Sequence, residues 1–307
     1  MKKNVLIIIL IILGLLLGSC SKTKSEEIQS YTRDTSSGTR EAFFSSIYFK
    51  EAIKDDSVLP KSALIVDGNG DMITKIKNDQ NAIGYISLSS FDENEVNGLN
   101  IDGVKPTDEN VLNGTYSLMR GFYYIVTKNL ESDADLLAQA FNAYINTLEA
   151  KLIIKSKGGI VDINDSLLKW EDIKSNYPIT LKDNSKTTLR FGGSTSVESI
   201  AKALSIDFSI RSGDVKIEHN YTGSSAAYKG TQGTDASSNN LLHVGFSSRN
   251  FNDNEKPIQN TSGMLAYDAI VTIVNKSNLL TNLSITTLKD IYLGKYKYFS
   301  EVIDNAN

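Results

Sequence analysis

The chain has 307 residues, of which 40% are hydrophobic and 22% charged, and its formal net charge is −4. This composition fits one or two globular domains and excludes a largely disordered protein. Because the balance is acidic and no block of like charges occurs, nucleic acid is a poor partner, since its phosphate backbone requires a basic surface.

The first twenty residues have the pattern of a lipoprotein signal peptide over residues 1–19. Two lysines precede an apolar run from Val5 to Leu17, which is short for a transmembrane helix and typical of a signal sequence. The run ends in Leu-Gly-Ser before Cys20, the only cysteine of the chain. We therefore predict that Cys20 becomes the lipid-modified N-terminus and that residues 20–30 form a tether. An uncleaved signal anchor is the alternative.

A short turn follows the tether. Ser37, Gly38 and Thr39 can direct hydroxyl and backbone N–H groups at one point, and a helix predicted from Thr39 to about Ile53 directs the positive end of its dipole there. Arg33, just before the turn, adds a forked cationic donor. Ordinary helix capping is the alternative explanation of such a turn.

Strands and helices are expected to alternate along the rest of the first half. The hydrophobic pattern predicts strands over 62–67, 82–88 and 122–127, and helices over 71–77 and 133–156. The polar segment 161–186 is interpreted as a long connector with one helix near Trp170.

The second half repeats both the alternation and the helix-start composition. Strands are predicted over 187–191, 215–220, 241–246 and 269–274, and helices over 197–204, 226–229 and 284–293. Turns at 192–196 and 222–225 are again small and rich in hydroxyl groups. The alternation predicts an α/β fold with largely parallel sheets, and the three turns suggest one anion held by several helix ends.

Taken together, these motifs resemble the phosphate-specific substrate-binding proteins of ABC importers, the PstS-like family. The resemblance covers about residues 31–160 and 187–307. It is carried by the segments TRDTSSGTRE (32–41), NAIGY (81–85), DGVKPT (102–107), YSLMR (116–120), GSTSV (193–197), GSS (223–225), GFSSR (245–249) and TLKDIYLGK (287–295).

The order of these segments differs from the family pattern. In the family the Gly-Ser-Thr-Ser block comes first, whereas here the block with Arg33 comes first. The chain therefore looks like a circular permutant in which the connector at 161–186 joins the old termini, a change that folds tolerate at exposed ends. A fragment of a tandem protein and a gene-model artefact are the competing explanations.

The resemblance implies a type II periplasmic-binding-protein fold, with two α/β lobes around a cleft. One lobe would be discontinuous, combining residues 31–117 with 276–307, and would carry Arg33 and the Ser-Gly-Thr turn. The other would be continuous over 118–275 and would carry the Gly-Ser-Thr-Ser motif. Anion binding between them would close the cleft, because donors come from both sides.

The resemblance also implies a set of phosphate ligands. They are Arg33, Ser37, Gly38 and Thr39 on one lobe and Thr195, Ser196, Ser224 and Ser248 on the other. Arg33 is the only full positive charge that we expect at the ligand. Ser248 stands where the best-known members have an aspartate that accepts the proton of phosphate. A hydroxyl group can accept that proton but does not repel sulfate, so the selectivity is left open.

The function implied is that of a lipid-anchored, monomeric phosphate receptor that faces outside the cytoplasm. It would deliver inorganic phosphate to the permease and ATPase of an ABC importer, and it would be neither an enzyme nor a cofactor-binding protein. Two lone histidines and one lipidated cysteine disfavour a zinc site. The alternatives are a binding protein for sulfate or molybdate, a phosphohydrolase, which would need a nucleophile with a base or a metal, and a surface lipoprotein without a transport role.

Overall fold

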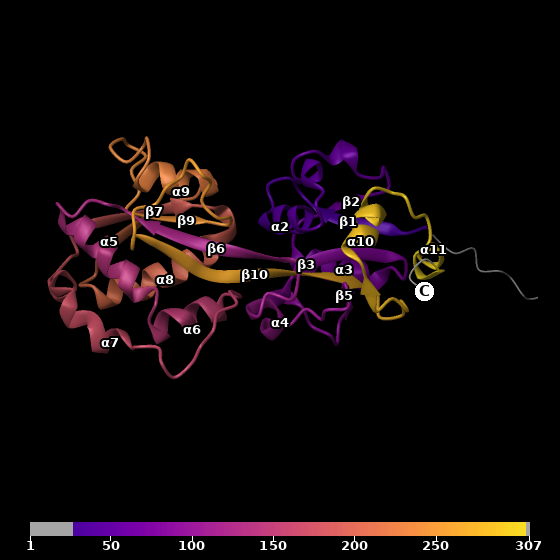
Figure 1. Cartoon of the computed structure of the whole chain (residues 1–307), viewed down its shortest axis with the longest axis horizontal. Helices are drawn as coiled ribbons and strands as arrows, with labels where there is room; N and C mark the ends of the chain where they lie inside the picture. Colours follow the sequence, from indigo (N-terminus) through magenta and orange to yellow (C-terminus); the bar gives the residue numbers. More distant parts are fainter. Residues whose placement is uncertain (1–26, 305–307) are drawn as a thin grey trace, which may run out of the picture.

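The computed structural model describes residues 27–304. It has two lobes joined by two long strands (Figure 1). The signal peptide at 1–19, the lipidation site at Cys20 and most of the tether lie outside the described residues.

A single mixed sheet of nine strands runs through both lobes. Its order is β2-β1-β3-β10-β6-β9-β7-β8, and β4 pairs with β10. The strands are β1 (Gln29–Arg33), β2 (Leu64–Val66), β3 (Ala82–Ser87), β4 (Asn97–Gly98), β6 (Met119–Val126), β7 (Thr188–Gly193), β8 (Lys216–Asn220), β9 (Val244–Ser247) and β10 (Ser262–Val274), with a separate parallel pair of β5 (Asn100–Ile101) and β11 (Asn282–Leu283). The outer strands of each lobe pair in parallel, whereas β10 is antiparallel to its neighbours.

The helices lie on either side of this sheet (Figure 1). In the first lobe they are α2 (Gly38–Ser46), α3 (Asn69–Asn78), α4 (Asp108–Leu112), α10 (Ile285–Tyr292) and α11 (Phe299–Asp304). In the second lobe they are α5 (Asp133–Tyr144), α6 (Leu148–Ser156), α7 (Trp170–Ile173), α8 (Glu198–Arg211) and α9 (Ser224–Thr231). Short 3-10 turns occur at η1 (Lys50–Ile53), η2 (Asp56–Val58), η3 (Leu88–Ser90), η4 (Lys174–Asn176), η5 (Pro178–Leu181) and η6 (Thr195–Val197).

Strand β10 passes from one lobe to the other and changes its partner on the way. Its residues up to Ala269 pair with β6, and its residues from Ile270 pair with β3. The chain crosses a second time beside it, where the Ile270 N–H donates to the Leu118 carbonyl at 2.8 Å. The two crossings therefore lie side by side and form the connection between the lobes. The sequence-based border at 275 falls after this change of partner, because the apolar run 269–274 does not reveal which strand it will pair with.

Each lobe has a hydrophobic core of its own. In the first lobe Phe43 of α2 stacks on Tyr85 of β3 with ring centroids 3.9 Å apart, and Tyr292 of α10 lies 5.0 Å from Phe43. Residues from 276 onward thus pack with residues before 118. In the second lobe Phe141 lies against Phe191, with centroids 4.7 Å apart. Since separate cores can move as separate bodies, the lobes are suited to opening and closing.

The segment at 161–186 is more than a solvent-exposed connector. It contains the helix expected near Trp170, and the Trp170 side chain is fully buried in the core of the second lobe. Its ring lies 5.8 Å from Tyr144 and 6.2 Å from Phe208. Farther along, the buried Asn184 amide donates to the Ser212 carbonyl at 2.8 Å. Trp170 and Ile179 of this segment are therefore part of the core, whereas Leu168 and Leu181 are exposed.

Replacing Trp170 by alanine is expected to lower the free energy of unfolding by about 3–5 kcal/mol, because the change removes a large buried ring. Urea unfolding followed by circular dichroism would measure this loss. Leu168→Ala is the matched control, since Leu168 is 58% exposed, and we expect it to cost under about 0.5 kcal/mol. A loss at Trp170 no larger than the control would show that the segment is dispensable for the core.

Three elements differ in extent from the expectation. Helix α2 ends at Ser46, because Tyr48 adopts a positive φ of 55° that an α-helix cannot contain. The predicted helix 133–156 is two helices, since Thr147 caps the start of α6. Strand β2, expected to be buried, pairs only with β1 at the edge of the sheet, so Ile65 is 53% exposed.

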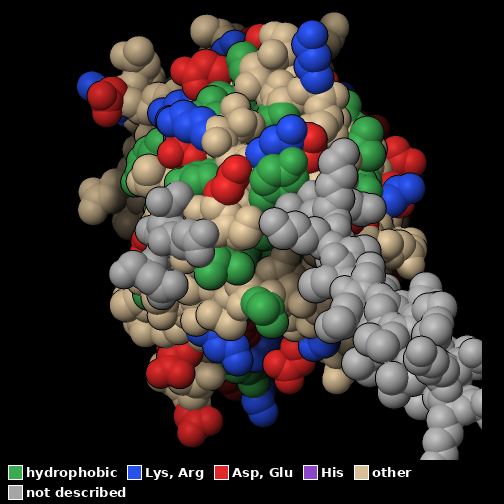
Figure 2. All heavy atoms as spheres, turned by 90° about the vertical axis from the view of Figure 1, so that its right-hand side faces the viewer, with side chains coloured by type: hydrophobic (Ala, Val, Ile, Leu, Met, Phe, Trp, Pro, Cys, Tyr) green, Lys and Arg blue, Asp and Glu red, His purple; other side chains and the backbone are tan. Residues whose placement is uncertain are grey.

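Charges of both signs are interspersed over the end of the molecule that carries α10 and α11, on the part of that face not covered by grey atoms (Figure 2). This face shows no extended basic surface for a nucleic acid, in line with the net charge.

Candidate anion-binding site between the lobes

The turn of the first lobe lies at the carboxyl end of β1, between Arg33 and the first residue of α2. The Ser37 hydroxyl caps α2 by accepting the Arg40 N–H at 3.3 Å. Asp34 Oδ1 accepts the Ser36 N–H at 2.8 Å, and its hydrogen bond with the Ser36 hydroxyl lowers the pKa of Asp34. The Asp34 carboxylate and the Ser37 hydroxyl therefore both stabilise the backbone of the turn.

Arg40 is a structural residue of this turn. Its side chain is fully buried, and its Nε donates to the Ala52 carbonyl at 2.8 Å. Its Nη1 donates both to the Arg33 carbonyl at 2.7 Å and to Asp56 Oδ1 at 2.6 Å. Arg40 thus holds the backbone of Arg33 against the η1–η2 segment and leaves the Arg33 side chain to point elsewhere.

In the second lobe three parallel strands end beside two helix starts. β7 leads through Ser194 into η6 and α8, and the Ser194 hydroxyl accepts the Ser196 N–H at 3.3 Å. Gly193 has a φ of 115°, and a β-carbon there would lie 2.1 Å from the Phe246 carbonyl oxygen, so glycine is required. β8 leads through Gly223 into α9, which begins at Ser224. Ligands commonly bind at such carboxyl ends of parallel strands.

A cavity of about 370 Å³ lies between the two lobes. Six of the eight residues that the sequence nominated line it: Arg33, Ser37, Gly38, Thr39, Thr195 and Ser196. The lobes touch here, because a β-carbon on Gly38 would lie 1.9 Å from Ser196 Oγ. Hydroxyl groups and the starts of α2 and η6, from opposite lobes, therefore face one space.

Ser224 and Ser248 do not line this cavity but form a hydroxyl cluster with Ser194. Ser194 Oγ donates to Ser248 Oγ at 2.9 Å, and Ser248 Oγ lies 3.0 Å from Ser224 Oγ. The Ser248 N–H also donates to Ser224 Oγ at 3.1 Å. The cluster adjoins the cavity through the cap that Ser194 makes to Ser196.

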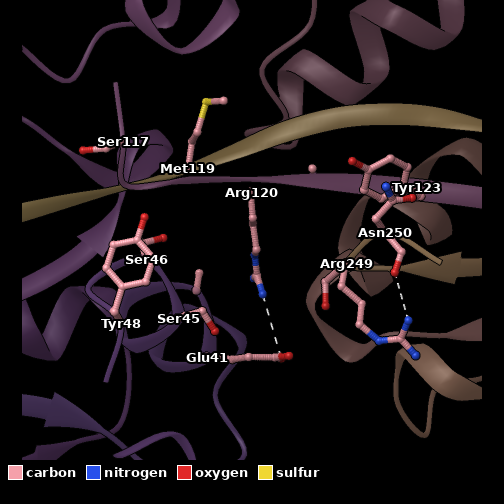
Figure 3. Close-up of a pocket in the computed structure, with 13 residues that line it drawn as sticks. Glu41, Ser45, Ser46, Tyr48, Ser117, Met119, Arg120, Tyr123, Arg249 and Asn250 are labelled. Carbon is pink, nitrogen blue, oxygen red and sulfur yellow. Dashed lines mark hydrogen bonds and ion pairs between the residues drawn. The ribbon is translucent and has the colours of Figure 1, made fainter. Parts of the chain in front are cut away.

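Ser248 lines a second cavity between the lobes, of about 380 Å³ (Figure 3). Arg120 lies between the lobes there, and its Nη1 is 3.9 Å from Glu41 Oε2 of α2. Arg249 is held within its own lobe by Glu255, with Nη1 at 2.7 Å from Oε2. Because Arg120 also lines the first cavity, the two spaces adjoin at its side chain.

Three charged residues at the first cavity were not nominated from the sequence: Arg120, Lys157 and Asp268. Arg33 is therefore not the only positively charged side chain that lines the cavity. Arg120 of β6 and Asp268 of β10 are cross-strand partners, and Arg120 Nε and Nη2 each donate to Asp268 Oδ2 at 3.2 Å. The pair depends on the register of two crossing strands far apart in sequence, so no local pattern could indicate it.

Two guanidinium nitrogens of arginines that line the cavity are buried without a hydrogen-bond partner among the described residues: Arg33 Nε, and Arg120 Nη1, which lies 3.9 Å from Glu41 Oε2. Arg33 Nη1 reaches Asn69 Oδ1 only at 3.5 Å. A buried neutral donor without a partner costs about 1–3 kcal/mol of stability, and a buried charged donor costs more. An anion in the cavity would give Arg33 a partner, so the arrangement is chemically suited to binding a small oxyanion by charge-assisted hydrogen bonds.

Within residues 27–304 no group of three or more His, Cys, Asp and Glu side chains is placed to hold a metal ion. In the same range no helix has the length and apolarity needed to cross a membrane. The two histidines, His219 and His243, lie in the second lobe, and burial lowers the pKa of each.

Comparison with known proteins identifies similar chains. Residues 180–306 match the model of a PBP superfamily domain. The chain is 28% identical over 283 residues to "Phosphate-binding protein PstS 2" of Streptococcus pneumoniae serotype 4, covering 92% of this chain and 89% of that one. It is 25% identical to "Phosphate-binding protein PstS 2" of Streptococcus agalactiae serotype V, covering 98% and 99%. "Phosphate-binding protein PstS" of Bacillus subtilis is 30% identical over 142 residues, covering 46% and 44%.

A solved structure agrees with these matches. The crystal structure of a phosphate ABC transporter, phosphate-binding protein from Streptococcus pneumoniae TIGR4 is 26% identical and has a TM-score of 0.74, and the match covers 90% of this chain and 99% of that one. The chain is thus PstS-like, and the predicted α/β periplasmic-binding-protein fold is confirmed. The relatives are binding proteins and not enzymes, which agrees with the expectation of no enzymatic activity.

Proposed function

We propose that this protein binds inorganic phosphate between its two lobes. The observation that carries the proposal is the 370 Å³ cavity in which helix starts from both lobes meet the side chains of Arg33 and Arg120, with Arg33 Nε buried and without a hydrogen-bond partner among the described residues. The similarity to chains named phosphate-binding proteins supports phosphate as the anion. The nominated ligands are Arg33, Ser37, Gly38, Thr39, Thr195 and Ser196 at the cavity, with Ser224 and Ser248 beside it.

The strength of such a site comes from the number of its donors. Hydrogen bonds to charged groups contribute about 1.5–3 kcal/mol each, whereas micromolar affinity needs about 8 kcal/mol net. Several donors must therefore act together, since desolvating a divalent anion opposes binding. Two arginines and two helix starts can supply that number.

Isothermal titration calorimetry of the purified protein tests this proposal. We expect one phosphate per chain with a dissociation constant in the micromolar range or below. Sulfate and molybdate titrated under the same conditions test the alternative of another oxyanion, which the hydroxyl group at Ser248 keeps open. If sulfate displaces bound phosphate at equal concentration, phosphate is not the ligand.

We infer further that the protein is a lipid-anchored receptor outside the cytoplasm that delivers phosphate to an ABC importer. The signal sequence before Cys20 supports the anchor. The solved relative is described as the phosphate-binding protein of a phosphate ABC transporter, which supports the importer. A Cys20→Ser protein that remains in the membrane fraction would argue against the anchor.

The order of the halves is proposed to be a natural circular permutation. Alignment with the Streptococcus agalactiae relative covers 98% of this chain and 99% of that one. A relative with the same order of halves supports a natural permutation and argues against a fragment of a tandem protein. Alignment with the Bacillus subtilis relative covers less than half of each chain, as a swapped order of halves would produce. If the unaligned half of this chain has no counterpart in the rest of that relative, the permutation is rejected.

A further inference from the structure

We infer that Asp268 selects the protonated anion. Its carboxylate accepts a hydrogen bond from the hydroxyl group that phosphate keeps at neutral pH. Sulfate has no such hydroxyl group and is therefore disfavoured. This inference rests on the proposed function of phosphate binding. It assigns the acceptor role to β10, at the connection between the lobes, and not to Ser248 at the end of β9.

Asp268 belongs to the cavity by position. It lines the same space as Arg33 and Thr195, and only 8% of its surface is exposed. Arg120 Nη2, which donates to Asp268 Oδ2 at 3.2 Å, also lies 3.2 Å from the place that a β-carbon on Gly38 would occupy. The Arg120 side chain therefore connects the Asp268 carboxylate to the place where Gly38 of one lobe meets Ser196 of the other.

The two carboxylate oxygens of Asp268 have different surroundings. Oδ2 accepts hydrogen bonds from Arg120 Nε and Nη2, both at 3.2 Å. Among residues 27–304, Oδ1 accepts only the Ser87 hydroxyl, at a long 3.3 Å. Because a carboxylate oxygen has two lone pairs, Oδ1 can accept one more hydrogen bond. Arg120 fixes the orientation of the Asp268 carboxylate.

The hydroxyl group of Ser248 lacks these properties. Ser248 Oγ already accepts the Ser194 hydroxyl at 2.9 Å and is within 3.0 Å of Ser224 Oγ. A hydroxyl group also carries a proton of its own, so it can donate to an unprotonated anion as readily as it accepts from a protonated one. An ionised carboxylate can only accept, and it repels an oxyanion that brings no proton.

Positively charged side chains at the cavity compensate the negative charge of Asp268. Arg33, Arg120 and Lys157 line the space together with Asp268, so that an anion still meets an excess of positive charge. The local arrangement therefore combines attraction for any anion with a specific penalty for an unprotonated one. Such a built-in repulsive element is a common source of specificity.

The test compares phosphate and sulfate dissociation constants of Asp268→Asn with those of wild type. The amide is close in shape but can donate to sulfate, so the preference for phosphate is expected to fall at least tenfold. Removing a negative charge raises affinity for every anion, and the ratio of the two constants cancels this effect. Asp165→Asn is the matched control, because Asp165 is exposed and does not line the cavity, and its ratio is expected to stay within twofold of wild type. Ser248→Ala tests the competing acceptor.

Wild-type protein provides a measurement that does not depend on a folded variant. Arsenate, which is protonated like phosphate, is expected to compete with phosphate, whereas sulfate and molybdate are not. The inference is overturned if Asp268→Asn binds phosphate with an unchanged ratio, if Ser248→Ala loses the preference, or if wild type binds sulfate as tightly as phosphate. If wild type binds no phosphate, the proposed function itself fails.

Discussion

Replacing Arg33 by alanine is expected to weaken phosphate binding by a factor of one hundred or more while leaving the free energy of unfolding almost unchanged. The Arg33 side chain lines the cavity, and its Nε is buried without a hydrogen-bond partner. Losing two charge-assisted hydrogen bonds costs at least about 3 kcal/mol, and each 1.4 kcal/mol is a tenfold change in affinity. Calorimetry with phosphate, together with a thermal melt, measures both quantities.

Two variants make this experiment specific. Arg190→Ala removes an arginine of β7 that pairs with Glu218 in the second lobe and does not line the cavity, so its phosphate affinity should stay close to wild type. Arg33→Lys keeps the charge but not the fork and should fall between wild type and Arg33→Ala. Near wild-type affinity in Arg33→Ala would remove Arg33 from the site.

Gly38→Ala is expected to weaken phosphate binding at least tenfold without destabilising the fold. A β-carbon at Gly38 would lie 1.9 Å from Ser196 Oγ and 2.8 Å from Ser196 Cβ, across the contact between the lobes. The lobes must then separate or the serine must move, and either change spreads the donors apart. Alanine is a better helix former than glycine, so α2 itself should be at least as stable. Calorimetry and thermal melting again measure the two effects.

Gly70→Ala is the matched control for this prediction. Gly70 also lies in the first turn of a helix, α3, and a β-carbon there meets nothing within 4 Å. We expect Gly70→Ala to bind phosphate as tightly as wild type. If Gly70→Ala weakens binding as much as Gly38→Ala does, the loss does not come from contact between the lobes.

Much of the nominated site could be predicted because its signals are local. Ser37 and Ser194 cap the helical turns that follow them, and such caps depend on residues only a few positions apart. The glycine at 193 is required by its own φ and by the strand beside it. Local sequence therefore predicts where a chain will present free N–H groups, and the resemblance to a family predicted which of these helix starts would bind one anion.

The rest depended on contacts between distant segments. Arg120 and Asp268 are 148 residues apart and meet only through the register of β6 and β10. Trp170 stands in a polar stretch, and its burial against Tyr144 and Phe208 requires the fold of the second lobe. The break between α5 and α6 was missed because the apolar spacing runs through it.

By itself, the sequence determined the α/β class, the small hydroxyl-rich helix starts and the position of Arg33 before the first of them, because hydrophobic periodicity and capping act over a few residues. Only the tertiary structure decided that Gly38 would touch Ser196, that Asp268 would enter the cavity beside Arg120, and that β10 would serve both lobes. The reason is physical: strand register and lobe contact are set by the packing of the whole chain, and no short segment carries that information.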